Sequence, residues 1–141
     1  DVNPKDHPKR YLDNKFYLDK IKVIEKICDG LNKKIKIIIY SENRSYESLD
    51  IFERYNLRIG SNTWSGDIEE IKETWKQMWS ADILLISKSF FSLVPAIYNK
   101  NIVLCMPINQ SRTTHKKMNY WINMTDSDYI KQLENKIRLS Y

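Results

Sequence analysis

The chain is poor in the residues that interrupt regular structure and in long apolar runs. It has 3 glycines and 4 prolines in 141 residues. No apolar run approaches the roughly 20 residues that a bilayer span requires. The charged opening, residues 1–15, resembles neither an apolar signal core nor an acid-poor transit peptide. The sequence therefore predicts a domain that neither crosses nor enters a membrane, and it leaves the location as cytoplasmic or undetermined.

Cysteine and histidine are equally scarce. Cys28 and Cys105 each sit among apolar neighbours, which predicts two reduced core thiols and not a disulfide. His7 and His115 are isolated, so no Cys/His grouping has the spacing of a metal site. The sequence also lacks G-x-G-x-x-G, P-loop and G-x-S-x-G patterns. Zinc, Walker-type and hydrolase chemistries have no support, and we expect neither a metal nor a cofactor.

The charge balance is basic but dispersed. There are 23 basic and 18 acidic residues, a net charge of +5, and the lysines are interspersed with acids. Such a surface suits anionic ligands in general. It is a weak signal for nucleic acid, which we regard as an unlikely partner. The cluster of Arg112, His115, Lys116 and Lys117 is more typical of a solvated loop than of a phosphate contact.

Apolar periodicity predicts helices alternating with buried strands. Helical spacing recurs over residues 14–29, 46–55, 67–79, 89–98 and in a last helix capped by Thr125 or Asp126. Gly30 is the expected residue just past the end of the first helix. Short apolar runs at residues 35–40, 57–59, 83–86 and 102–106 read as strands.

This alternation defines the expected fold class. It predicts an α/β, Rossmann-like three-layer domain, in which a parallel sheet is flanked by helices. A length of 141 residues is ordinary for a single domain. We therefore expect one domain over residues 1–141.

In an open parallel sheet, ligands bind beyond the carboxyl ends of the strands. Four polar segments follow the predicted strands: Ser41–Asn43, Ser61–Thr63, Ser87–Ser89 and Asn109–Arg112. The third is the sharpest, because a buried strand runs through a serine-rich turn straight into a helix. A helix N-terminus attracts phosphate. Ser87, Ser89 and Ser92 would add hydroxyl donors and Lys88 a charge. Alternatively, Ser89 only caps the helix and Phe91 packs beneath it.

At this segment the sequence resembles a family. Residues 87–92, SKSFFS, resemble the S-N-S-S-F-S signature of fucosyltransferase-like GT-B glycosyltransferases, and Met78–Asp82 resembles the M-s-x-A-D that precedes it. The departures are Lys88 for a small polar residue and Phe90 for serine. Ile37–Glu42 resembles the family strand that ends in F-S-D/E.

The beginning of the chain carries the same resemblance. Asp1 and Val2, followed by Arg10 and Tyr11 and by Phe16 and Tyr17, resemble the residues around and after the family's H-x-R-R-G-D motif. Asp1 would be the last residue of that motif, with the arginine pair upstream. We therefore expect a fragment of a longer transferase, inactive without the N-terminal domain of the same protein. The resemblance covers roughly residues 1–107.

The resemblance implies the donor-binding domain of a glycosyltransferase. Such a domain binds a nucleotide sugar, typically GDP-fucose, and transfers the sugar to a glycan acceptor with inversion and without a metal. Ser87, Lys88, Ser89, Phe91 and Ser92 are the candidates for phosphate and sugar, and Ser41 and Glu42 for the nucleoside. Thr74 is a weaker candidate for the base, and the neighbouring Trp75 is expected to lie in the core.

No catalytic residue is identified. The alternative is a non-catalytic α/β interaction or nucleic-acid-binding module.

Overall fold

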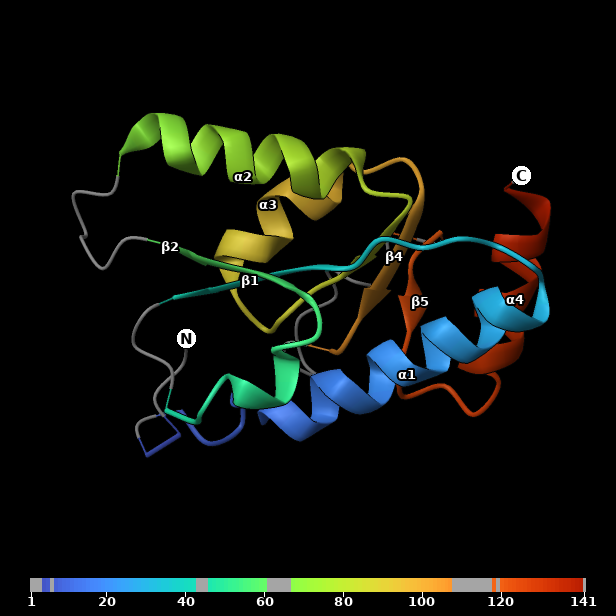
Figure 1. Ribbon diagram of the computed structural model, residues 1–141, viewed down its shortest axis with the longest axis horizontal. Helices are drawn as coiled ribbons and strands as arrows, with labels where there is room; N and C mark the ends of the chain where they lie inside the picture. Colours follow the sequence, from blue (N-terminus) through green and yellow to red (C-terminus); the bar gives the residue numbers. More distant parts are fainter. Residues whose placement is uncertain are drawn as a thin grey trace. The chain divides into compact units, whose positions relative to one another are not determined.

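The described elements follow the order α1, β1, η1, β2, α2, β3, α3, β4, β5 and α4, and the strands pair in parallel (Figure 1). The computed structural model describes residues 4–5, 7–42, 46–60, 67–107, 118 and 120–140. The strands form two sheets, one of β1 and β2 and one of β3, β4 and β5, and all described pairings are parallel. The predicted α/β class with parallel strands flanked by helices is confirmed. The chain divides into two compact units, Asp1–Glu70 and Ile71–Tyr141.

The first unit begins with helix α1, Asn14–Gly30, close to the predicted span. Asp13 caps its start by accepting a hydrogen bond from the Phe16 N–H at 2.7 Å. At its end, Asn32 has a φ of 55°, and the Lys33 N–H reaches the Cys28 carbonyl at 2.8 Å. This is a Schellman ending with Asn32 as its left-handed residue. The prediction that Gly30 takes this position was wrong, because Gly30 is still helical.

Strands β1, Ile38–Glu42, and β2, Asn56–Gly60, pair in register from Ile38 opposite Asn56 to Glu42 opposite Gly60. β1 starts later than the predicted 35–40, and Ile35 lies outside it with 40% of its surface exposed. The predicted helix over residues 46–55 was wrong, because only a 3-10 turn, η1 (Asp50–Phe52), forms there.

No α-helix forms over residues 46–55 because residues at the start of this segment bind the beginning of α1. The Tyr11 hydroxyl donates to the Glu47 carboxylate, and the Asn14 N–H donates to the same carboxylate at 2.8 Å. The Asn14 side-chain amide donates to the Ser48 carbonyl at 2.9 Å. Glu47 and Ser48 therefore satisfy the beginning of α1 and do not begin a helix of their own.

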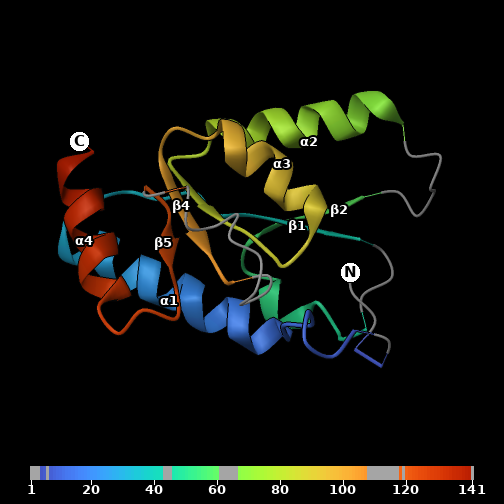
Figure 2. The same cartoon turned by 180° about the vertical axis from the view of Figure 1, so that it is seen from behind.

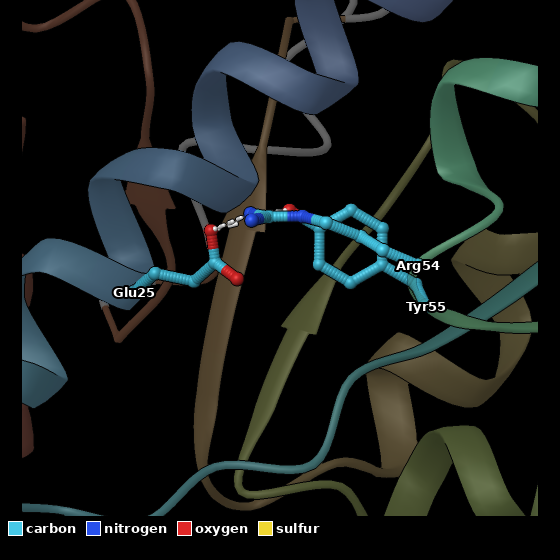
Figure 3. A network of polar contacts seen from close by, with 3 residues as sticks. All are labelled: Glu25, Arg54 and Tyr55. Carbon is cyan, nitrogen blue, oxygen red and sulfur yellow. Dashed lines mark hydrogen bonds and ion pairs between the residues drawn. The ribbon is translucent and has the colours of Figure 1, made fainter.

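A second contact joins the far side of η1 to α1. The Arg54 guanidinium lies 2.6 Å from the Glu25 carboxylate, and the Tyr55 hydroxyl donates to the same carboxylate at 3.1 Å (Figure 3). Arg54 also lies over the Tyr55 ring, 4.7 Å from its centroid. Because Arg54 is more than half exposed, this network positions the chain that enters β2 more than it stabilises the fold.

Helix α2, Ile68–Ser80, starts where Asp67 accepts a hydrogen bond from the Glu69 N–H at 3.0 Å, and its length carries it into the second unit. There β3 (Ile83–Leu85), β4 (Ile102–Cys105) and β5 (Ile122–Asn123) form a sheet in that order, and α3 (Phe90–Tyr98) connects the first two. The predicted elements at residues 67–79, 83–86, 89–98 and 102–106 are confirmed. β5 was not predicted, because two residues are too few to show a period.

The core of the second unit centres on β4, which is buried along its whole length. Helix α4, Tyr129–Leu139, packs beside β4 and β5 through Leu133 and Ile137 (Figure 2). The prediction that Thr125 or Asp126 caps this helix was wrong. Asp128 occupies that position without a side-chain bond, while Thr125 and Asp126 hydrogen bond to the Asn123 side chain.

Candidate functional site

The candidate site is the turn that connects β3 to α3, residues 87–92, called here the serine turn. The Ile86 N–H donates to the Leu104 carbonyl at 3.0 Å, so the chain stays on the sheet until this turn begins. Ser89 then caps α3: its backbone is extended and its hydroxyl oxygen accepts from the Phe91 N–H at 3.2 Å. The turn is therefore built from the carboxyl end of a buried strand and a capped helix start.

Ser92 is bound within the turn itself. Its side chain is buried, and its hydroxyl oxygen lies 3.1 Å from the carbonyls of both Ser87 and Ser89. The same oxygen lies 3.0 Å from the Ser87 hydroxyl. A serine hydroxyl has one proton to donate, and this geometry directs that proton to a turn carbonyl. Ser92 therefore braces the serine turn from inside.

The other residues of the serine turn are nearer the surface. Ser87, Lys88 and Ser89 are half-buried. Phe91 is 41% exposed, so it is not sealed beneath the turn. The Ser89 hydroxyl and the residue Lys88 thus stand at the start of α3, a combination suited to an anion, while the Ser87 hydroxyl donates to Ser92.

Helix α2 borders this turn from the side. α2 and α3 lie side by side in both views (Figures 1 and 2), and the Trp75 ring packs on Phe91 with 5.8 Å between centroids. The Trp75 indole N–H is buried and has no hydrogen-bond acceptor among the described residues. Thr74, the weaker base candidate, is half-buried on the same helix. The expectation that Trp75 acts as packing agrees with this ring contact.

The two nucleoside candidates lie in the other unit. Ser41 and Glu42 are the last two residues of β1, paired with Ile59 and Gly60. They are at the carboxyl end of the strand, but within it and not in the loop that follows. The remaining candidates lie outside the described residues: Asp1, Asn43, Ser61–Thr63, Asn109–Arg112 and the basic cluster with His115, Lys116 and Lys117.

Among the described residues, the titratable groups with altered pKa values are not members of the serine turn. Burial, and then the bond to Glu47, raises the pKa of Tyr11 to about 12. Burial raises the pKa of the Cys105 thiol to about 11, and it also raises the pKa of Cys28. Both cysteines are free and buried, as predicted. In the described part of the chain, no three His, Cys, Asp or Glu side chains gather as a metal site would need.

The described part of the chain contains no helix with the length and apolar character to cross a bilayer.

Sequence reasoning missed two features of the structure around α3. The hydrogen bonds from the Ser92 hydroxyl to carbonyls of its own turn could not be predicted from the sequence, because they depend on how the turn folds. A hollow at the opposite end of α3, lined by Ile97, Tyr98, Lys100 and Tyr120, was also missed, since its walls are far apart in the sequence.

Comparisons with protein-family models, with curated proteins and with solved structures found no match for this chain. The assignment to the α/β class consequently stands on the strand pairing and helix packing described above.

Proposed function

We propose that the serine turn binds the phosphates of a nucleotide sugar, with a GDP-sugar such as GDP-fucose as the expected ligand. The chain would be the donor-binding part of a fucosyltransferase-like GT-B enzyme, which transfers the sugar to a glycan acceptor with inversion and without a metal. The observation that carries the proposal is Ser89, which caps a helix that begins directly beyond the carboxyl end of a parallel strand.

The physical argument is electrostatic. The start of α3 carries a partial positive charge from its aligned peptide dipoles. Ser89 supplies a half-buried hydroxyl and Lys88 a full positive charge, while the Ser87 hydroxyl donates its proton to Ser92. Ser92 acts indirectly, by holding the carbonyls of Ser87 and Ser89 in place. A phosphate at this point would therefore meet donors that are already oriented.

This arrangement suits sugar transfer as well as binding. When the bond between the sugar and the diphosphate breaks, negative charge grows on the departing phosphate while the acceptor hydroxyl attacks the opposite face of the sugar. Oriented donors placed where charge develops are often the largest single contribution to catalysis. In the proposal, the turn and Lys88 supply that stabilisation.

Calorimetric titration with GDP tests the proposal. We expect wild-type protein to bind GDP, and Lys88→Gln to weaken that binding by about tenfold or more, the size of a lost charge-assisted hydrogen bond. Ser87→Ala should weaken it less. Lys76→Gln is the matched control, because Lys76 is an exposed lysine on α2 and should leave GDP affinity unchanged.

Two results would overturn the proposal. One is the absence of binding to GDP, UDP and their sugars at millimolar concentration. The other is oligonucleotide binding that falls steeply with added salt together with indifference to GDP, which would assign the chain to the nucleic-acid-binding class instead.

A further inference from the structure

A recess lies at the end of α3 that is remote from the serine turn. It has a volume of about 390 Å³ and is lined by Ile97, Tyr98, Lys100 and Tyr120. α3 has 9 residues, and a helix rises about 1.5 Å per residue, so the recess is about 12 Å along the axis from the turn. We call it the tyrosine hollow. It is a separate place from the proposed phosphate site.

Three of the four described residues that line the tyrosine hollow are large hydrophobic or aromatic side chains that are exposed. Tyr98 is 66% exposed, Ile97 45% and Tyr120 41%. Trp79 from α2 is 45% exposed and extends this surface, because its ring lies 6.3 Å from that of Tyr98. Aromatic side chains that gather at a surface commonly mark a place where something binds.

The frame that holds these walls is rigid. Asn99, between Tyr98 and Lys100, is completely buried. Its side-chain amide donates to the Met78 carbonyl at 3.0 Å and the Ala81 carbonyl at 2.9 Å, and its side-chain oxygen accepts from the Asn101 N–H at 2.7 Å. The backbone on both sides of Asn99 is therefore fixed.

The opposite wall is also anchored. The Lys136 ammonium group, on α4, donates to the Tyr120 carbonyl, which ties the Tyr120 segment to that helix. A recess whose walls are held before binding loses little conformational freedom when a ligand enters.

The chemistry of the lining selects a class of ligand. Two phenol rings and an isoleucine side chain favour a flat, apolar ring over a fully solvated group. Among the described residues that line the hollow, Lys100 carries a charge, and its positive charge favours a negatively charged substituent on that ring. A volume near 390 Å³ fits the lower end of small-molecule sites, which span about 300 to 1,000 Å³.

We propose that the tyrosine hollow is a binding site for a small ring-containing anion, in which the ring lies against Tyr98 and Tyr120 and the carboxylate or phosphate group meets Lys100. The ring would displace water from the exposed faces of both tyrosines, and the anion would stay partly solvated. This site is independent of the nucleotide site.

Three simple probes separate the contributions of ring and charge. Benzoate has both, benzamide keeps the ring without the charge, and acetate keeps the charge without the ring. We expect amide chemical shifts around Tyr98 and Lys100 to report millimolar binding of benzoate. Benzamide should bind about three- to fivefold more weakly, the size of one exposed ion pair, and acetate should not saturate.

Variants then assign the contacts. Lys100→Gln should remove the preference for benzoate over benzamide, whereas Lys131→Gln, an exposed lysine on α4, should keep it. Tyr98→Ala should abolish binding of both ring probes, and Tyr98→Phe should restore it. Because Tyr98 is largely exposed, thermal unfolding should show both variants to be folded.

The proposal is overturned if benzoate causes no shifts at the tyrosine hollow. It is equally overturned if Lys100→Gln binds benzoate as tightly as wild type does, or if benzoate shifts only the serine turn. GDP binding at the serine turn is measured separately, so failure of either proposal leaves the other standing.

Discussion

Single side chains hold the loops of this protein in place, and Asn99 is the strongest example. It is buried, and both its amide hydrogens and its oxygen have partners on α2, on the turn after it and on Asn101. Ser92 plays the same part at the other end of α3. One helix is thus fixed at both ends by buried polar groups, which are costly to leave unsatisfied.

Asn99→Asp should destabilise the protein strongly. The substitution replaces the donor of two hydrogen bonds by an oxygen that faces the Met78 and Ala81 carbonyls. We expect the free energy of unfolding to fall by about 3 kcal/mol at neutral pH, since each unsatisfied buried group costs roughly 1 to 3 kcal/mol. Urea unfolding measures this loss.

Asn101→Asp is the matched control. The Asn101 side chain is exposed and makes a single longer bond, 3.2 Å, to the Ala81 carbonyl, so we expect a loss below about 1 kcal/mol. Equal losses for the two variants would contradict the structural role given to Asn99.

The raised pKa of Tyr11 determines how the free energy of unfolding should respond to alkaline pH. Its pKa is raised from 10.0 to about 12 in the folded protein by burial and by the hydrogen bond to Glu47. A raised pKa means that the folded state holds the phenol proton more tightly, so its stabilisation is fully present below pH 10 and is lost between pH 10 and about 12.

Tyr11→Phe should reduce this alkaline loss. The variant should be less stable than wild type at neutral pH, because it lacks the bond to Glu47, and the difference should shrink as pH rises above 10. Urea unfolding over a series of pH values measures it. A difference that stays constant or grows with pH would show that Tyr11 does not hold its proton in this way.

At the scale of elements, the end of α1 gives a direct test of local backbone chemistry. Asn32 has a φ of 55°, a left-handed conformation in which alanine is strained, while Gly30 is helical and has no atom within 4 Å of the position a Cβ would take. Gly30→Ala should therefore raise the free energy of unfolding by about 0.5 to 1 kcal/mol.

Asn32→Ala should lower the free energy of unfolding by about 1 kcal/mol, and Asn32→Gly should not. Thermal unfolding of the three variants gives the order. If Gly30→Ala destabilised the protein and Asn32→Ala did not, Gly30 and not Asn32 would end the helix.

The elements that could be predicted from the sequence are those with enough residues to show a period. α2 and the unbroken apolar run of β4 were found for this reason. The helix expected over residues 46–55 has helical spacing too, but Glu47 and Ser48 bond to the start of α1, and this long-range contact outweighs the local pattern. β5 is too short for any pattern.

The serine turn was located by the same logic, because a strand followed by a capped helix is visible in the residue order. The hydrogen-bond partner of each serine hydroxyl could not be predicted from the sequence. Ser89 and Ser92 look alike in the sequence, yet Ser89 caps the helix from a half-buried position and Ser92 is buried against two carbonyls. Such roles depend on the folded path of the turn.

At the scale of the whole molecule, the parallel pairing of strands brings the carboxyl ends of segments distant in the sequence to one edge of each sheet. Residues of β4 and β5 that pair, Leu104 with Ile122 and Cys105 with Asn123, are 18 positions apart. The whole chain carries a net charge of +5, which favours anions in general. The charge alone cannot choose a site, and the serine turn is where we expect it to be used.

The most direct test of that claim is an NMR titration of the wild-type chain with GDP. The account predicts that the amide signals of Ser87, Lys88, Ser89 and Phe90 move first and saturate together, and that Lys88→Gln suppresses these shifts while Lys76→Gln does not. Saturating shifts that leave the serine turn unmoved, or no shifts at millimolar GDP, would contradict it.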